Sequence, residues 1–309
     1  MAENSPSPQA VFDCLKCQVS PTTHQCSASK IIRYGAFVGS VIESYSSLPR
    51  AMDKARQLIR SAVGDGKSVA SGTVILADTM SNCKGRFSRE WHAPAGGVWG
   101  CMIHANTLLP QSRQFVSLAV GVACCEAVRE FGGEGALLRW VNDLLVDGRK
   151  LAGFLIETYT ERTHGEEFTL VGFGVNVNNS AFPAELTDCA VSLAEILGKH
   201  ITLTTFTTLF LAKLAWCFGV LYHEEALELR GESFSGSAGK HMLLERWLQL
   251  SDTVGKKVVY GFDVMTAPQY CAEVLRVDEY GGLVLRLEDG FEKTEYSGEV
   301  RYVHNYDTR

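Results

Sequence analysis

The sequence contains no apolar run close to the roughly 20 residues that a helix needs to cross a bilayer. Its first residues, Met1 to Gln9, include an acid and no apolar stretch, so they do not resemble a secretory signal. The same segment has no arginine, which argues against a mitochondrial address. Lysine and arginine together number 29 against 35 aspartates and glutamates, for a net charge of -6. With no strongly basic block, we expect neither nucleic acid nor a membrane as a partner.

The chain also lacks the regular cysteine pairs of a disulfide framework, although it has ten cysteines. Cys124 and Cys125 lie in an apolar helical stretch, where they resemble small core residues. Scattered thiols of this kind fit a reducing compartment, and we expect a cytoplasmic protein.

Hydrophobic residues make up 46% and charged residues 21% of the 309 residues, which is ordinary for a soluble globular enzyme. The length allows one large domain and a small one. Residues 1–30 are rich in serine, proline, threonine and glutamine, which predicts a flexible extension. Four side chains there could in principle bind zinc, namely Cys14, Cys17, His24 and Cys26. Their second pair lacks zinc-finger spacing, so a mobile tail with reduced thiols is the simpler interpretation.

Between residues 31 and 252 the hydrophobic pattern alternates between strand and helix periods. Strands are expected at 41–47, 72–77, 98–103, 137–145, 154–159 and 168–177, and helices at 48–63, 114–131, 190–197 and 203–229. Asp147-Gly148 predicts a hairpin turn. In the final segment, residues 253–309, short strands at 257–261, 270–277, 283–287 and 292–303 predict a small β-barrel domain.

A basic loop follows the second predicted strand. Lys84, Arg86 and Arg89 surround Gly85, and Trp91 closes the loop. Guanidinium groups beside a closely approaching backbone suit a polyphosphate, and the indole can border an adenine. A merely solvated basic loop is the competing interpretation.

Polar residues then interrupt an apolar stretch at Arg139-Trp140-Val141-Asn142-Asp143. A buried strand does not tolerate the amide and carboxylate without partners, so they predict the edge of a site, where Asp143 can also hold Mg²⁺. A turn cap is the alternative, because both residue types favour turns. Lys150 opens the next apolar strand, and its ammonium can neutralise a carboxylate or an acyl phosphate. In isolation it is equally well a surface lysine.

Two glycines occur in the strand Gly172-Phe173-Gly174-Val175-Asn176-Val177-Asn178. Glycine within a strand indicates close approach by a ligand or by another backbone, and tight sheet packing is the plainer explanation. Asn176 and Asn178 are expected on one side of this strand by its period of two.

In their order along the chain, these segments resemble biotin protein ligases (holocarboxylase synthetases). The corresponding stretches are Ser46-Ser47-Leu48, Lys84 to Trp91, Trp140 to Asp143, Lys150 to Leu155, Gly172 to Asn176 and, in the small domain, Ser297-Gly298-Glu299. The resemblance covers residues 31 to 304. It implies an α+β fold with a class II synthetase-like mixed sheet and an SH3-like C-terminal β-barrel.

The resemblance also implies a two-step reaction. Biotin and MgATP give biotinoyl-AMP and pyrophosphate, and a lysine of a biotin carrier domain of a biotin-dependent carboxylase then attacks the mixed anhydride. By this similarity Lys150, Arg86 and Arg89 are catalytic. Ligand contacts are implied for Ser46, Ser47, Met80, Ser81, Lys84, Gly85, Arg86, Trp91, Asn142, Asp143, Lys150, Gly153, Gly172 and Asn176. Asp143 is the implied metal ligand.

Some positions depart from the family pattern. Cys83 and Ser88 replace glycines of the basic loop, and Lys84 replaces its first arginine. Leu48 replaces an asparagine, and Met80-Ser81 stands where the family has Gln-Gln. We therefore expect the departures to affect the biotin side of the site more than the ATP side.

Two other functions remain open at the level of sequence. A lipoate-protein ligase shares the catalytic fold, but no Arg-Arg-x-x-Gly-Gly-Gly stretch is present. A non-catalytic small-molecule-binding homologue is possible because one fold hosts several functions. A repressor is less expected, since about 30 residues before Ile31 are too few for a DNA-binding winged helix.

Overall fold

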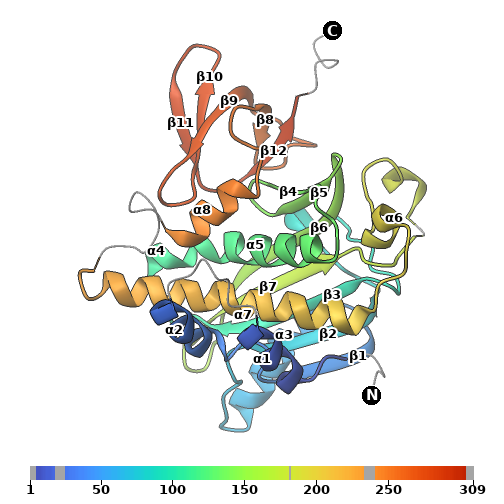
Figure 1. The fold of residues 1–309 in the computed structure, drawn as a ribbon, viewed down its shortest axis with the longest axis vertical. Helices are drawn as coiled ribbons and strands as arrows, with labels where there is room; N and C mark the ends of the chain where they lie inside the picture. The colour runs from blue at the N-terminus through green and yellow to red at the C-terminus, as the bar shows by residue number, and fades with distance from the viewer. Residues whose placement is uncertain (1–4, 18–24, 181, 233–240, 304–309) are drawn as a thin grey trace.

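The computed structural model describes residues 5–17, 25–180, 182–232 and 241–303. Figure 1 shows a large sheet flanked by helices, with a second, smaller sheet at one end of the molecule. The large sheet has seven strands and the small sheet has five. This arrangement confirms the predicted α+β fold class.

The seven-stranded sheet is mixed. Its first two strands in space are parallel and all other neighbours are antiparallel. In spatial order the strands are β1 (Ile42–Leu48), β2 (Thr73–Met80), β3 (Val98–Ala105), β7 (Glu167–Val175), β6 (Arg149–Thr160), β5 (Asp143–Val146) and β4 (Ala136–Arg139). Strands β6 and β7 form a long hairpin that includes residues 154–159 and 168–177, both of which are predicted as strands from the sequence.

Each face of this sheet has its own apolar core, because successive side chains of a strand point to opposite faces. Helix α3 (Ala51–Gly64) covers one face, where Met52 and Ile59 pack with Ile75 of β2. Helices α5 (Phe115–Glu130) and α7 (Leu203–Glu228) belong to the larger core on the other face. Shorter helical segments are α4 (Pro110–Arg113), η1 (Arg86–Ser88), η2 (Ala184–Leu186) and α6 (Leu193–Leu197).

By length and composition alone, α7 resembles a membrane-spanning helix. Its most apolar window is 67% buried inside the protein, and Phe206, Phe210 and Phe218 are fully buried. A helix that is apolar all round is also what the centre of a large core requires. Helix α7 therefore has the burial of a core helix.

The N-terminal residues differ from the expected flexible extension. They contain α1 (Pro8–Cys17) and α2 (Gln25–Gly35), and Val11 and Leu15 of α1 are buried. A Cβ on Gly219 of α7 would lie 2.1 Å from the Ile31 carbonyl oxygen, so α2 and α7 are in backbone contact. The polar composition concealed two apolar residues four positions apart, which is enough for one helix face. His24 of the considered zinc group lies outside the described residues.

The polar segment after β4 is a turn, where the sequence predicts one strand over residues 137–145. Strands β4 and β5 pair antiparallel, with Arg139 opposite Asp143, and residues 140–142 join them. Trp140 is 2% exposed, and its Nε1–H donates to the Gly281 carbonyl, 3.1 Å away. The following Asp147-Gly148 turn confirms the predicted hairpin, with both residues at positive φ.

Helix α8 (Met242–Gln249) leads into the C-terminal sheet. Its strands in spatial order are β11 (Glu292–Glu295), β10 (Leu283–Leu287), β9 (Tyr270–Val277), β8 (Lys257–Gly261) and β12 (Glu299–Tyr302). Three of these strands have the predicted bounds. The fourth predicted strand, 292–303, is divided by a turn containing Gly298 at φ 98°. There a Cβ would lie 2.6 Å from the Tyr260 hydroxyl, so only glycine fits without a shift.

Candidate active site

A cavity of about 250 Å³ lies between the seven-stranded sheet and the basic loop. Its floor contains glycines of β6 and β7, where Gly153 is paired with Gly174. The Trp91 indole covers this pair. A Cβ on Gly174 would lie 2.7 Å from Trp91 Nε1, and one on Gly153 would lie 3.0 Å from the ring. At Gly174 the sequence predicts close approach by a ligand or another backbone, whereas the structure has a side chain of the protein itself, Trp91, at this position.

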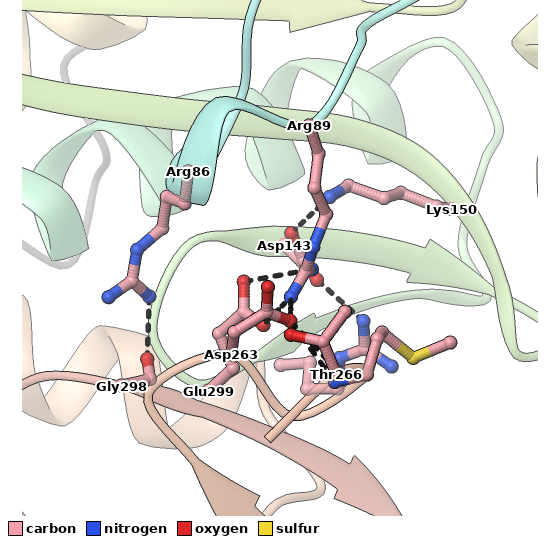
Figure 2. Close-up of polar contacts among 10 residues, drawn as sticks. Arg86, Arg89, Asp143, Lys150, Asp263, Thr266, Gly298 and Glu299 are labelled. Atoms are coloured by element: carbon pink, nitrogen blue, oxygen red, sulfur yellow. Dashed lines mark hydrogen bonds and ion pairs between the residues drawn. The ribbon is translucent and has the colours of Figure 1, made fainter. Parts of the chain in front are cut away.

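Lys150 lies beside this indole, with Nζ 5.3 Å from the ring centroid. Its ammonium pairs with Asp143 Oδ1 at 2.6 Å, while Arg139 Nη2 pairs with Oδ2 at 2.5 Å (Figure 2). Burial by itself would raise the pKa of Asp143, but the two cations outweigh it and hold the pKa at about 2. The carboxylate is therefore charged at neutral pH and fixes the position of Lys150.

The same contacts bear on the predicted metal ligand. Both oxygens of Asp143 already face a cation, so the carboxylate does not fit a Mg²⁺ ion without losing one of these pairs. Among the described residues, no cluster of three His, Cys, Asp or Glu side chains is placed to hold a metal. The side chains of the cavity do not form a resident metal centre.

Two asparagines predicted for the site tie the strand ends together. Asn142 Nδ2 donates to the Phe154 carbonyl at 2.9 Å, and Asn176 Nδ2 donates to the Lys150 carbonyl at 3.4 Å. Asn176 Oδ1 accepts from Asn179 Nδ2 at 3.0 Å. Both amides line the cavity, and both fix backbone on which Lys150 depends.

The basic loop is fastened from the C-terminal sheet. Arg86 Nη1 donates to the Gly298 carbonyl at 2.5 Å, and Arg89 forms two bonds to Glu299, at 2.7 and 3.2 Å (Figure 2). Arg89 also pairs with Asp263. Lys84 is exposed beside the cavity. The two arginines therefore link the loop to the second sheet, and Lys84 is the cation of this loop that faces solvent.

The far end of the cavity is apolar and rich in sulfur. Met52, Met80, Cys83 and Leu155 line it, and the Cys83 thiol lies 3.3 Å from Met80 Sδ. Burial raises the pKa of the Cys83 thiol to about 11, so it is neutral there. Arg50 contributes the charged side chain of this wall.

Most of the residues predicted for the site do line this cavity. They are Met80, Lys84, Gly85, Arg86, Arg89, Trp91, Asn142, Lys150, Gly153, Gly172 and Asn176. Ser46, Ser47 and Ser81 are exposed and are not among the lining residues, and Asp143 acts from behind Lys150.

Three residues of the site are not predicted from the sequence, namely Arg50, Glu299 and Asp263. Arg50 has one sequence signal, its place two residues after the Ser46-Ser47-Leu48 segment, at the start of the helix predicted over 48–63. Glu299 belongs to a recognised motif but has no predicted contact. Asp263 has no local signal at all, because its contact to Arg89 joins residues 174 positions apart.

Comparison with known proteins agrees with this geometry. A model of the biotin/lipoate A/B protein ligase family matches residues 65–178, which include the basic loop, Lys150 and the glycine strands. The bifunctional ligase/repressor BirA of Bacillus subtilis is 29% identical over 238 residues, which cover 74% of this chain and 66% of that protein. The biotin–[acetyl-CoA-carboxylase] ligase of Paracoccus denitrificans is 32% identical over 111 residues, covering 33% of this chain and 43% of that protein.

A solved structure shows the same fold. The biotin protein ligase from Aquifex aeolicus in complex with biotin and ATP superposes with a TM-score of 0.65 at 20% identity, covering 86% of this chain and 99% of that chain. The likeness extends over most of this chain and shows that its fold is shared with that structure. By the family match, the relatives and the shared fold, the chain is similar to biotin protein ligases.

Proposed function

We propose that this protein is an ATP-dependent ligase that activates biotin as biotinoyl-AMP and transfers it to a lysine of a biotin carrier domain. The observation that supports it best is Lys150. Its ammonium is held by Asp143 at 2.6 Å, next to an indole, in a cavity whose other wall is apolar. A fixed cation beside an apolar pocket suits a carboxylic acid with a large apolar body.

In the first step, a biotin carboxylate oxygen bonds to the α-phosphorus of ATP, and the bond to the β-phosphate breaks to release pyrophosphate. Mg²⁺ enters as part of the MgATP substrate. Lys150 stabilises the carboxylate and phosphate oxygens as charge moves between them. Asp143 is a positioning residue, since it contacts Lys150 and not the cavity.

In the second step, the amine of the carrier lysine attacks the acyl carbon, AMP leaves, and the amine gives up its proton as the amide forms. The nucleophile belongs to the partner, so this chain contributes positioning and charge stabilisation. The glycine floor and Trp91 shape the nucleotide side, and Lys84 is the solvent-facing cation that meets phosphates. We also propose a reducing, cytoplasmic location, in which the cysteines stay as thiols.

The decisive measurement is isotope exchange between ATP and pyrophosphate in the presence of biotin. We expect exchange that needs biotin, followed by labelling of a purified biotin carrier domain on its lysine. Lipoate serves as the parallel acid. Exchange with lipoate and none with biotin would refute the proposal in favour of a lipoate ligase, and no exchange with either would indicate a non-catalytic homologue.

A further inference from the structure

The far end of the cavity holds an ion pair among apolar side chains. Arg50 has a side chain that is 14% exposed and lines the cavity just before helix α3. Its Nη2 donates to Glu157 Oε1 at 2.9 Å and lies 3.4 Å from Met52 Sδ. Its Nη1 is 3.8 Å from the nearest carboxylate oxygen, on Asp53, which is too long for a hydrogen bond.

Strand β6 gives the distance between this pair and Lys150. Every second residue of a strand points to the same face, so Gly153, Leu155 and Glu157 share one face of β6. At about 3.3 Å per residue, Glu157 lies about 13 Å along the strand from Gly153, where Lys150 and Trp91 lie. Leu155 is paired with Gly172, over which Met52 Sδ packs, at 2.9 Å from where a Cβ would be. The cavity therefore has a cation at one end, an apolar middle and a guanidinium at the other end.

A purely structural role for Arg50 would be to fasten α3 to β6. Arg56 already serves this purpose, because its Nη2 pairs with Glu157 and its Nη1 pairs with Asp53 at 2.7 Å. Arg56 does not line the cavity. Two arginines thus share one carboxylate, and only Arg50 faces the ligand space.

We propose that Arg50, held by Glu157, is a specificity-determining residue that binds the polar end of the acid opposite its carboxylate. The inference rests on the proposed function and names what that site selects. In biotin the polar end is the ureido group, whose carbonyl accepts from a guanidinium. The side chains of the neighbouring Met52, Met80 and Leu155 offer no oxygen acceptor, so an acid without a hydrogen-bonding head gives Arg50 Nη1 no acceptor in the cavity.

Biotin-dependent ATP–pyrophosphate exchange of Arg50→Leu and Arg56→Leu tests the proposal. We expect Arg50→Leu to raise the KM for biotin at least tenfold and to leave the KM for ATP within about twofold. Arg56→Leu also removes a cation that pairs with Glu157, and we expect its KM values for biotin and for ATP to stay within about twofold of wild type. Arg50→Lys keeps the charge with fewer donors and is expected to fall between wild type and Arg50→Leu.

The selectivity between biotin and a competing acid is a second measurement, and a general loss of protein stability would not change it. The wild-type protein should prefer biotin to lipoate, whose dithiolane ring has no N–H or carbonyl. Arg50→Leu should lower the ratio of kcat/KM for biotin to kcat/KM for lipoate at least tenfold. An unchanged biotin KM in Arg50→Leu, or equal effects of both leucine variants, would overturn the role of Arg50 while the ligase function stands. A wild-type protein that does not use biotin would overturn both.

Discussion

At the scale of single residues, the Lys150–Asp143–Arg139 triplet concentrates the chemistry. Asp143 is mostly shielded from solvent between two cations, with 14% of its side chain exposed, and removing one partner of such a group leaves a charge without compensation. From sequence alone, Asp143 could be a turn cap and Lys150 a surface lysine. The pairing of these residues with Arg139 across β4, β5 and β6 makes them a site, and only the three-dimensional structure shows it.

Replacing Lys150 by alanine should lower the rate of biotin-dependent exchange at least about a hundredfold, because a fixed cation at developing charge contributes on that order. Arg149→Ala is the matched control. Both side chains are 34% exposed on adjacent positions of β6, but Arg149 pairs with Glu195 outside the cavity. A Lys150→Ala rate within threefold of wild type, at an unchanged thermal midpoint, would contradict the role assigned to Lys150.

The low pKa of Asp143 predicts how the free energy of unfolding changes at acid pH. Its pKa is depressed in the folded protein, so it adds stability above its unfolded value of 3.8 that is lost as the pH falls through about 2. The shift corresponds to about 2 kcal/mol. Urea unfolding at pH 4 and pH 2 should therefore show a decrease in unfolding free energy that is about 2 kcal/mol smaller in Asp143→Asn than in wild type. Equal decreases in both proteins would show that the carboxyl is not held by its cations.

At the scale of elements, the glycine pair on β6 and β7 gives Trp91 its place. Gly174→Ala would put a methyl group 2.7 Å from Trp91 Nε1 and must displace the indole or the strand. We expect at least a tenfold weaker binding of ATP, measured by calorimetry, and a shifted tryptophan emission. Gly64→Ala adds the same methyl group where nothing lies within 4 Å, and should change neither. Unaltered emission and affinity in Gly174→Ala would rule out the proposed contact.

The N-terminal helix α1 allows a test of burial against composition. Leu15 is fully buried and Phe12 is 37% exposed on the same helix. Leu15→Ala should lower the free energy of unfolding by about 2 to 3 kcal/mol, the lower part of the range for a buried leucine. Phe12→Ala should cost about 0.5 kcal/mol or less. Similar small effects of both changes in chemical denaturation would favour the flexible extension that composition predicts.

Local patterns predicted some elements well and others poorly, for identifiable reasons. The bounds of β8, β9 and β10 followed from short alternating runs between turn residues, which are local signals. The sequence predicts a strand through residues 140–142, where the structure has a turn. Trp140 is an apolar residue that this turn buries, so its residue type does not distinguish the turn from a strand. The basic loop was recognised by residue type, yet its contacts to Gly298 and Glu299 join residues more than 200 positions apart. Such long-range contacts leave no periodicity in the sequence.

At the scale of the whole molecule, the site needs both sheets. The catalytic sheet supplies the floor and Lys150, while the C-terminal sheet holds the basic loop that forms the roof (Figure 2). Trp140 and Tyr260, from the two parts, belong to one continuous apolar core. The two sheets are therefore connected in two ways, through the contacts of the basic loop and through the shared apolar core. Substitutions can remove the first and leave the second.

The double variant Asp263→Ala/Glu299→Gln removes the carboxylates that hold Arg89 and leaves the shared core intact. We expect amide hydrogen exchange in residues 83–91 to become at least tenfold faster, because the bond from Trp91 N to the Cys83 carbonyl then lies in a loop that has lost the contacts of Arg89. The thermal midpoint should fall by only a few degrees, since the apolar contact between the sheets remains. Asp289→Ala is the control, as this carboxylate bonds only within its own turn, to Phe291 N. If exchange in the loop is as slow in the double variant as in the control, the contacts of Arg89 to Asp263 and Glu299 do not hold the loop.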